Sequence, residues 1–424
     1  MKDVQGKRLL IVSSDANDLE IVNAAKEMGV YVVCCDRYEN WDVSPAKKAA
    51  DAAWNVDYTD IETVKALCEK EKIDGVLAGY GEDRVYAACK ISNAIGTPFY
   101  ATEEQIEITR NKRLFKEVCA RYGVRVPKEY CFSLPMTEEA LASVQYPVIV
   151  KPSDNGGRKG ITICYDETQL KEAIELAIAF SKDGNIVVEE YLAGVEMSSV
   201  YTMKDGEISL SCVNDKYSSD SEGYKAALCG FVVTPSRFYD QYVREIDPGI
   251  KHMLRSIGAK NGMAYFQHIA TPNGIVPFEM GYRLNGNNDF KVIRKYNGID
   301  YMKMLISHSV SGDMGDSLEK DNPQFGEYYC TYVVQLNAGK ISKVDYSGIE
   351  KRENIDDIFI WKNAGDTVIE SSTNTHKCGM IKFYAKTVEE IYETVKDIHE
   401  KVLILDENGD SMLMNRFEGD WLRG

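Results

Sequence analysis

An alternation of short apolar runs with amphipathic stretches fills the first hundred residues and limits the folds open to this chain. The apolar runs have the length of buried strands, and the stretches between them repeat apolar side chains at helical spacing. The strands and helices that we expect follow one another at about 8–12, 19–28, 30–35, 61–70, 75–78 and 85–96. Repeated strand–helix–strand units predict a parallel sheet with helices on both faces, which binds ligands at the carboxyl ends of its strands.

Dinucleotide binding, the most familiar use of such a sheet, does not fit the first turn. The fingerprint for a pyrophosphate needs glycines so that the backbone can approach the ligand. No glycine lies between Val12 and Met28. Asp36 ends the second expected strand, where an acid could bind a ribose, but alone it is better explained as a turn residue. We therefore exclude a nicotinamide cofactor.

Composition narrows the class of protein further. The 424 residues carry 50 Lys and Arg against 66 Asp and Glu, a formal charge of −16, which argues against binding to nucleic acid or to an anionic membrane. No apolar run reaches the ~18 residues of a membrane span, and the N-terminus lacks a secretory signal. The 11 cysteines form no C-x-x-C pair, so neither a disulfide framework nor a zinc site is indicated. We expect a soluble, cytoplasmic protein of about three domains.

The rest of the chain changes character twice. From about residue 128 short strands alternate with turns rich in glycine and aspartate, and a polar stretch at 311–316 precedes a last block. That block has expected strands at 328–335 and 379–385, and a helix that opens on a capping box of Thr387 and Glu390. We place the domains at 1–109, 110–312 with a mobile lid at roughly 128–192, and 313–424.

Two lysine-bearing stretches are candidates for phosphate binding. Residues 111–116 include Lys112, although an amphipathic helix with solvated lysines is the better interpretation of this stretch alone. An expected strand at 146–152 delivers Lys151 into the glycine-rich turn 153–160. Glycines let backbone amides wrap an oxyanion, and a lysine adds a point charge. A β-hairpin with a loose polar turn is the alternative.

Two further stretches suggest a nucleoside site and a metal site. Exposed backbone between Glu190 and Leu192 could read an adenine edge and Glu196 could accept from ribose hydroxyls, although a plain edge strand is the simpler interpretation. Two antiparallel strands joined at 271–274 would place Gln267 beside Glu279, and paired oxygens suit Mg²⁺. The nearby Arg283 suits a transferring phosphoryl group. A hairpin with a surface ion pair is the alternative, and His268, which alternates with Gln267, should face away from the metal.

The four stretches, in this order and spacing, resemble the ATP-grasp superfamily over nearly the whole chain. The nearest branch holds carbamoyl-phosphate synthase large chain, biotin carboxylase and the purine-pathway carboxylate ligases. The resemblance implies α/β and α+β architecture: an N-terminal parallel-sheet (pre-ATP-grasp) domain, a two-lobed ATP-grasp core and a C-terminal α+β domain.

The resemblance also implies roles for individual residues. The catalytic residues would be Arg283 and Lys151, and the ligands of Mg²⁺ or Mn²⁺ would be Gln267 and Glu279. ATP would be bound by Lys112, Lys151, Ser153, Asn155, Gly156, Gly157, Gly160, Glu189, Glu190, Tyr191, Leu192 and Glu196. The chain departs from the family's E-x-N-x-R run, because Gly281 stands where the family has asparagine. Nearby asparagines could substitute at a different spacing: Asn285, Asn287 or Asn288.

The activity implied is that of an ATP-dependent carboxylate–amine ligase that works through an acyl phosphate. A carboxyphosphate-forming carboxylase of the purine-pathway kind and a nucleotide-binding protein with impaired catalysis are the alternatives. Glu82 could bind the substrate amine, although a helix-capping acid is the better interpretation, and residues 214–219 could line the acceptor side. The expected partners are a small-molecule carboxylate and an amine, with a homodimer possible.

Overall fold

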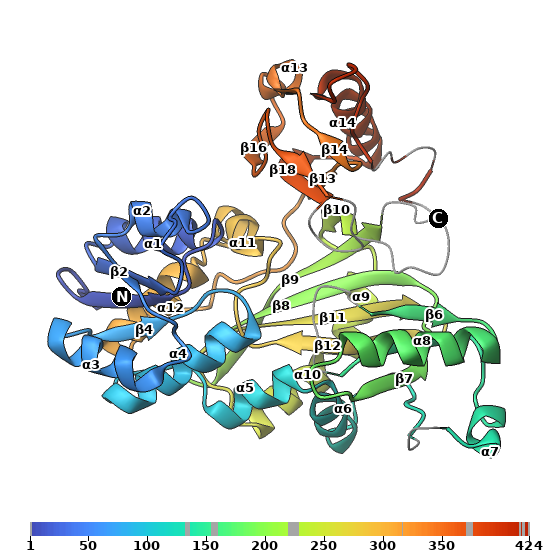
Figure 1. Ribbon diagram of the computed structural model, residues 1–424, viewed down its shortest axis with the longest axis horizontal. Helices are drawn as coiled ribbons and strands as arrows, with labels where there is room; N and C mark the ends of the chain where they lie inside the picture. The colour runs from blue at the N-terminus through green and yellow to red at the C-terminus, as the bar shows by residue number, and fades with distance from the viewer. Residues whose placement is uncertain are drawn as a thin grey trace.

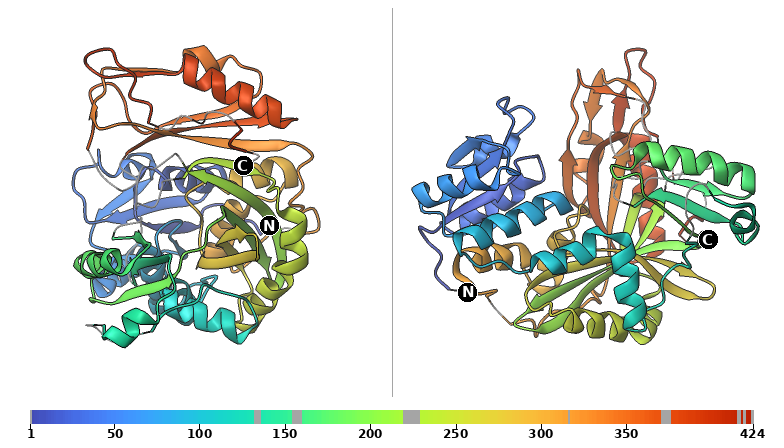
Figure 2. Two further views of the ribbon diagram at one scale, coloured as in Figure 1. Left: turned by 90° about the vertical axis from the view of Figure 1, so that its right-hand side faces the viewer. Right: turned by 60° about the horizontal axis from the view of Figure 1, so that its bottom comes forward.

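The computed structural model describes residues 2–131, 136–153, 160–218, 229–315, 317–369, 376–414, 417 and 420–422. The largest sheet has eight strands and is called the main sheet below; the other elements are arranged around it (Figure 1). The blue N-terminal set and the green three-stranded sheet lie toward opposite ends of this main sheet, and the orange and red C-terminal elements rise between them (Figures 1 and 2). Within the part of the chain described, every helix is too short or too polar to cross a bilayer.

The N-terminal set is the parallel sheet that the sequence predicts. Its four strands lie in the order β3-β2-β1-β4, and all three pairings are parallel. The strands are β1 (Arg8–Val12), β2 (Tyr31–Asp36), β3 (Ala52–Asn55) and β4 (Gly75–Leu77). The helices are α1 (Asp18–Glu27), α2 (Pro45–Ala49), α3 (Ile61–Glu71) and α4 (Glu82–Ile95), followed by α5 (Glu103–Arg110) and α6 (Lys112–Arg121). The short elements α2 and β3 are absent from the sequence expectation, because neither shows a clear apolar period.

A small antiparallel sheet forms most of the segment expected as a lid. Its order is β6-β5-β7. It consists of β5 (Val148–Pro152), β6 (Thr162–Cys164) and β7 (Ile186–Glu190), with α7 (Glu138–Ala142) before it and α8 (Glu167–Phe180) between β6 and β7. Val148, Val150 and Leu170 belong to an apolar cluster of its own. This unit therefore has an apolar core of its own, and its mobility as a lid stays a prediction.

The main sheet is antiparallel and has the order β12-β11-β8-β9-β10-β13-β18-β16. Its strands are β8 (Val195–Lys204), β9 (Glu207–Ser218), β10 (Cys229–Thr234), β11 (Gly262–Thr271), β12 (Gly274–Gly281), β13 (Tyr328–Gln335), β16 (Ile355–Ile360) and β18 (Lys377–Ala385). The remaining helices are α9 (Tyr239–Glu245), α10 (Asp247–Ser256), α11 (Asp289–Asn297), α12 (Tyr301–Ser311), α13 (Ser347–Glu350) and α14 (Val388–Lys401). Two small sheets have two strands each. One consists of β14 (Gly339–Lys340) and β17 (Thr367–Val368), and the other of β15 (Lys343–Asp345) and β19 (Leu403–Leu405).

The domains expected at 1–109, 110–312 and 313–424 contact one another through strands and helices on both sides of each expected boundary. Strand β13 pairs with β10, so the C-terminal strands extend the main sheet instead of forming a separate one. Helix α12 packs against the N-terminal strand β4, where a Cβ on Gly75 would lie 2.0 Å from the Ser309 carbonyl oxygen. Glycine at this position lets the helix approach the strand.

The start of α14 differs in one detail from the expected capping box. The Thr387 hydroxyl accepts from the Glu390 amide, as expected. The Glu390 carboxylate, however, accepts from the amide of Lys386, one residue before the cap. Thr387 and Glu390 thus both accept hydrogen bonds from backbone amides at the start of α14, but the Glu390 carboxylate bonds to the amide one residue before that of the N-cap.

Candidate active site

Gln267 and Glu279 lie directly opposite each other on β11 and β12. The short turn, in which the Thr271 hydroxyl donates to the Gly274 carbonyl at 2.8 Å, sets the pairs from Thr271–Gly274 to His268–Pro277. A register shift between His268 and Gln267 then skips one residue of β12 and brings Glu279 opposite Gln267. The expected pairing of the two oxygen-bearing side chains is therefore confirmed. His268 lies on the other face, fully buried and hydrogen-bonded to Ser199. Burial lowers the pKa of His268 to about 3, so its ring is neutral at ordinary pH.

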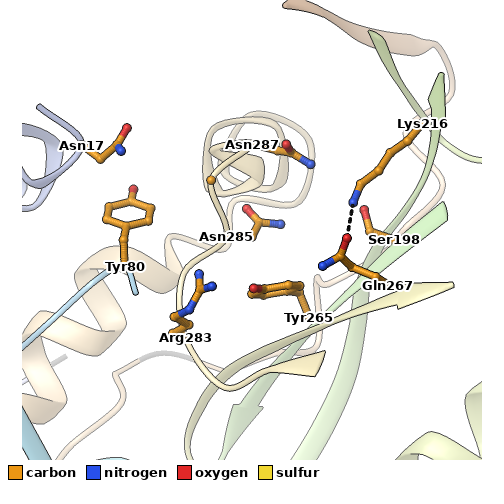
Figure 3. A pocket seen from close by; sticks show the side chains of 10 residues that line it. Asn17, Tyr80, Ser198, Lys216, Tyr265, Gln267, Arg283, Asn285 and Asn287 are labelled. Carbon is orange, nitrogen blue, oxygen red and sulfur yellow. Dashed lines mark hydrogen bonds between the residues drawn. The ribbon is translucent and has the colours of Figure 1, made fainter. Parts of the chain in front are cut away.

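Lys216 brings an ammonium group to this pair from β9. Its Nζ lies 3.5 Å from Gln267 Oε1 and 3.5 Å from Glu196 Oε1. The Lys216 side chain is only 9% exposed, so its charge acts in a partly desolvated site where it is weakly screened. Figure 3 shows the lysine pointing from its strand toward Gln267. Lys216 belongs to the stretch 214–219 that we expected on the acceptor side.

Arg283 stands just beyond the end of β12 and is paired with Glu82. The Arg283 Nε donates to Glu82 Oε1 at 2.7 Å, and a second guanidinium nitrogen lies 2.5 Å from the same oxygen. The guanidinium carbon also lies 5.2 Å from the centre of the Tyr265 ring. Glu82 is the first residue of α4. The structure therefore brings Glu82 to the site as the counterion of Arg283, not as a free carboxylate facing a substrate amine.

These side chains surround a pocket of about 270 Å³ between the N-terminal set and the main sheet (Figure 3). It is lined by Asn17, Tyr80, Ser198, Lys216, Tyr265, Gln267, Arg283, Asn285, Gly286 and Asn287. These described lining residues include two cations, four side-chain amides and three hydroxyls, but no carboxylate. Such a lining suits an anion that can also accept hydrogen bonds.

A second cluster lies where the sequence places the nucleotide. Glu189 is 3% exposed and forms ion pairs with both Lys151 and Lys116. Lys116 also donates to Glu129 at 2.9 Å. Burial alone would raise the pKa of Glu189, but the two lysines outweigh burial and hold its pKa below the usual value. Glu189 and Lys151 are thus brought together, and each is part of one buried ion network.

The other expected nucleotide residues lie around this network. Lys112 begins α6, and its charge acts on Lys151. The amides of Glu190 and Tyr191 are satisfied by the carbonyls of Lys128 and Pro147. The idea that this stretch reads an adenine edge therefore depends on Leu192.

The ends of the glycine-rich turn are described, but its middle is not. The Ser153 amide donates to Asn185, and Gly160 has a φ of +70° close to Phe180. Asn155, Gly156 and Gly157 lie outside the described residues. The expected closure of 153–160 over a nucleotide stays a prediction.

Comparisons with known proteins bear on the fold of the chain. The family model described as D-ala D-ala ligase C-terminus matches residues 124–240. The carbamoyl phosphate synthase large chain of Clostridium acetobutylicum is 24% identical over 310 residues, which cover 69% of this chain and 27% of that protein. The formate-dependent phosphoribosylglycinamide formyltransferase of Prochlorococcus marinus is 28% identical over 190 residues, which cover 44% of this chain and 48% of the relative. The chain thus spans less than half the length of these two curated relatives.

Among solved structures, an L-amino acid ligase from Bacillus licheniformis superposes with a TM-score of 0.81 at 17% identity, over 95% of this chain and 100% of that one. The chain has the ATP-grasp fold. The resemblance expected from the sequence is therefore confirmed. Because the sequence identity to the solved structure is low, this likeness shows the fold and nothing finer.

Gly281 stands where the resemblance implies an asparagine, next to the expected metal ligands Gln267 and Glu279. A Cβ built on Gly281 would lie 2.5 Å from the Tyr265 ring and 2.7 Å from its hydroxyl oxygen. Tyr265 is opposite Gly281 on β11. The aromatic ring therefore fills the space that the family's asparagine would need, and a side chain at 281 would require Tyr265 to move.

The donor set fits one hard cation of the kind that ATP-grasp proteins use. Gln267 and Glu279 offer an amide and a carboxylate oxygen, and Mg²⁺ is commonly held by one or two such groups together with phosphate oxygens. Nowhere in the described ranges do three or more His, Cys, Asp or Glu side chains gather as a metal cluster. Asn285 is engaged with Asp289 through both of its amide atoms: the nitrogen donates to the Asp289 carboxylate at 2.5 Å, and the oxygen accepts from the Asp289 backbone amide at 3.4 Å. The pair of Gln267 and Glu279 fits one ion.

Several residues of the pocket and of the Glu189 ion network were not predicted from the sequence. Lys116 lies one helical turn after Lys112, and this spacing was the only signal that it would join the ion network of Glu189. Tyr265, Ser198 and Asn17 carry no motif, because each enters the pocket through packing of distant segments.

Proposed function

We propose that this protein is an ATP-dependent ligase that joins a small carboxylate to an amine through an acyl phosphate. The observation that carries the proposal is the pocket, in which Lys216 and Arg283 lie beside the oxygen pair of Gln267 and Glu279. A cavity suited to an anion next to a place suited to Mg²⁺ is the arrangement that phosphoryl transfer to a carboxylate requires.

Residues of this chain bind and orient the nucleotide and the substrates. When bound, ATP with Mg²⁺ supplies the phosphoryl group that makes a carboxylate reactive toward an amine. Lys112 and Lys151 are proposed to hold the phosphates, and Gln267 with Glu279 to hold the ion. Arg283, fixed by Glu82 and by the Tyr265 ring, presents a planar guanidinium to developing negative charge. Lys216, on β9, opposes the charge of the carboxylate substrate. Positioning and electrostatics of this kind carry most of the rate in phosphoryl transfer.

The similar proteins support a ligase. One of the similar solved structures is an L-amino acid ligase, and the matching family model is that of a ligase C-terminus. The polar lining of the pocket supports small, hydrophilic substrates over large apolar ones. Self-association as a homodimer and a cytoplasmic location remain predictions.

The test is a screen for ADP release with pairs of small carboxylates and amines in the presence of Mg²⁺. We expect ADP and the coupled product only when both members of a productive pair are present. Lys216→Met should abolish this turnover, whereas Lys171→Met, which alters an exposed lysine of α8, should leave it unchanged. Both variants keep the length and apolar stem of lysine.

Two results would overturn the proposal in different ways. ADP release that needs bicarbonate and no carboxylate–amine pair would indicate the carboxyphosphate-forming alternative. ATP binding by calorimetry without turnover for any pair, including bicarbonate, would indicate a nucleotide-binding protein with impaired catalysis.

A further inference from the structure

A buried lysine of the C-terminal strands reaches toward the pocket without lining it. Lys382, on β18, is 1% exposed. Its Nζ donates to the carbonyl of Asn287 at 3.1 Å and to that of Asn288 at 3.3 Å. An ammonium group removed from water is tolerated only where acceptors replace its hydration. Its two carbonyl partners are therefore held at a defined place.

Both carbonyls belong to the loop between β12 and α11, and this loop forms one wall of the pocket. Asn285, Gly286 and Asn287 line the cavity (Figure 3). Asn288 has the left-handed φ of +56°, a conformation that asparagine adopts more readily than most residues. The Tyr80 hydroxyl also donates to the Asn288 side chain at 3.2 Å. The shape of this wall thus depends on contacts from outside the loop.

Charged groups of two elements surround the Lys382 ammonium. Burial lowers its pKa to about 8, and the carboxylate of Asp289 on α11 acts in the opposite direction. Lys291 on α11, with Asp356 and Asp357 on β16, completes the charges that act on it. Lys291 in turn lies 3.1 Å from Asp357 and 3.1 Å from Glu20 on α1. The start of α11 is therefore tied to the N-terminal set and to the C-terminal strands.

The Asp289 carboxylate continues these contacts to the opposite wall of the pocket. It accepts from Asn285 at 2.5 Å and from Asn214 at 3.1 Å. Asn214 also donates to Ser198, which lines the cavity from β8. A chain of buried polar contacts thus joins Lys382 and its loop to the strands on the far side of the pocket.

We propose that Lys382 is a positioning residue that holds residues 284–288 in the shape of the pocket wall, so that the C-terminal strands form part of the substrate site. Lys382 acts through two backbone carbonyls and does not itself touch the substrate. The inference rests on the proposed function only in treating the pocket as the place where the carboxylate binds.

Hydrogen–deuterium exchange measured without any ligand tests the positioning itself. The reporters are the amides of Asn288 and Lys291, which donate to carbonyls within this loop. In Lys382→Met we expect peptides covering 284–291 to exchange about tenfold faster, with peptides of β1 and β4 unchanged. Lys382→Arg, which keeps a cationic donor, should restore most of the protection. Lys386→Met, at an exposed position just after β18, is the matched control and should change nothing.

Kinetics distinguish this inference from the proposed function. If a carboxylate–amine pair turns over, Lys382→Met should raise the KM for the carboxylate about tenfold or more with the KM for ATP unchanged. Unaltered exchange of 284–291 in Lys382→Met would overturn the positioning role, and faster exchange throughout the chain would assign Lys382 to the general core instead. If no pair turns over in the native protein, the proposed function fails while the exchange result still decides the role of Lys382.

Discussion

Arg283 and Glu82 form an ion pair across 201 residues of sequence, with the Arg283 Nε 2.7 Å from Glu82 Oε1. The pair joins the end of β12 to the first turn of α4, so the cation on one wall of the pocket is fixed by a carboxylate of the N-terminal set. A displacement of either part would move the guanidinium. The position of the Arg283 charge in the pocket therefore depends on both the N-terminal set and the main sheet.

We expect Glu82→Gln to lower the free energy of unfolding by about 2 kcal/mol, because a largely buried guanidinium loses its counterion. The Arg283 side chain is 15% exposed and that of Glu82 31%. Urea unfolding measures the change. Asp83→Asn, at the adjacent carboxylate that is 62% exposed and paired with Arg110, should cost less than about 0.5 kcal/mol. Equal losses in the two variants would contradict the special role of the pair.

Lys151→Ala is expected to remove measurable ATP binding while the chain stays folded. Lys116 would still compensate Glu189, so the buried carboxylate keeps one partner. Isothermal titration with ATP and Mg²⁺ gives the affinity, and circular dichroism checks the fold. Lys171→Ala changes an exposed lysine and should bind ATP like the native chain. Native affinity in Lys151→Ala would refute the assignment of the nucleotide site.

Adding the family's asparagine should not by itself create a second metal site. We expect Gly281→Asn to lower stability by about 1–3 kcal/mol, because its Cβ would lie 2.5 Å from the Tyr265 ring. Combined with Tyr265→Ala, the asparagine has room, and the double variant should bind more Mn²⁺ per chain than Tyr265→Ala alone. Electron paramagnetic resonance with ADP present counts the bound ions. A Gly281→Asn chain as stable as the native one would show that the ring is not an obstacle.

Asp18 gives the stability of the chain a defined pH dependence. Burial, with the Asp15 carboxylate adding to it, raises the pKa of Asp18 from 3.8 to about 7. Between about pH 4 and 7 the folded chain keeps a proton on Asp18 that the unfolded chain releases. Its contribution to stability is therefore present below this window and is lost as pH rises through it. Asp18→Asn should flatten thermal stability over this range.

A second carboxylate provides the opposite sign as a control for that experiment. Hydrogen bonds from Thr63 lower the pKa of Asp60, so its contribution is lost as pH falls. Asp60→Asn should therefore reduce the loss of stability on acidification. Identical pH profiles for the native chain and Asp18→Asn would show that Asp18 titrates normally.

Local rules predicted the parts of the site that neighbouring residues determine. The strand at 8–12 coincides with β1 because an unbroken apolar run leaves little choice. The short turn predicts Gln267 and Glu279 on adjacent strands, although their direct pairing also needs the register shift between Gln267 and His268. Gly281 is visible as a departure from the motif in the sequence, but the ring that fills its place comes from the facing strand and has no motif of its own.

Contacts between distant segments could not be predicted. Lys216 reaches Gln267 across the intervening strand β8, which requires the order of the main sheet. Glu82 looked like a helix-capping acid or an amine ligand because nothing near it in sequence suggests an arginine partner. The polar stretch 311–316 indicates the start of a new block in the sequence. In the structure, strand β13 after this stretch pairs with β10 before it. This pairing depends on hydrogen bonds between distant segments, which local sequence patterns do not predict.

The pairing of β10 with β13 bears on how this molecule can be dissected. A fragment ending near residue 312 would leave the backbone donors and acceptors of β10 without their neighbour and would uncover Phe231, whose ring packs against Tyr332 and Phe383. A bare strand margin beside exposed aromatic rings recruits other chains. Truncated versions would therefore tend to aggregate, and workable cuts lie at surface loops away from that seam.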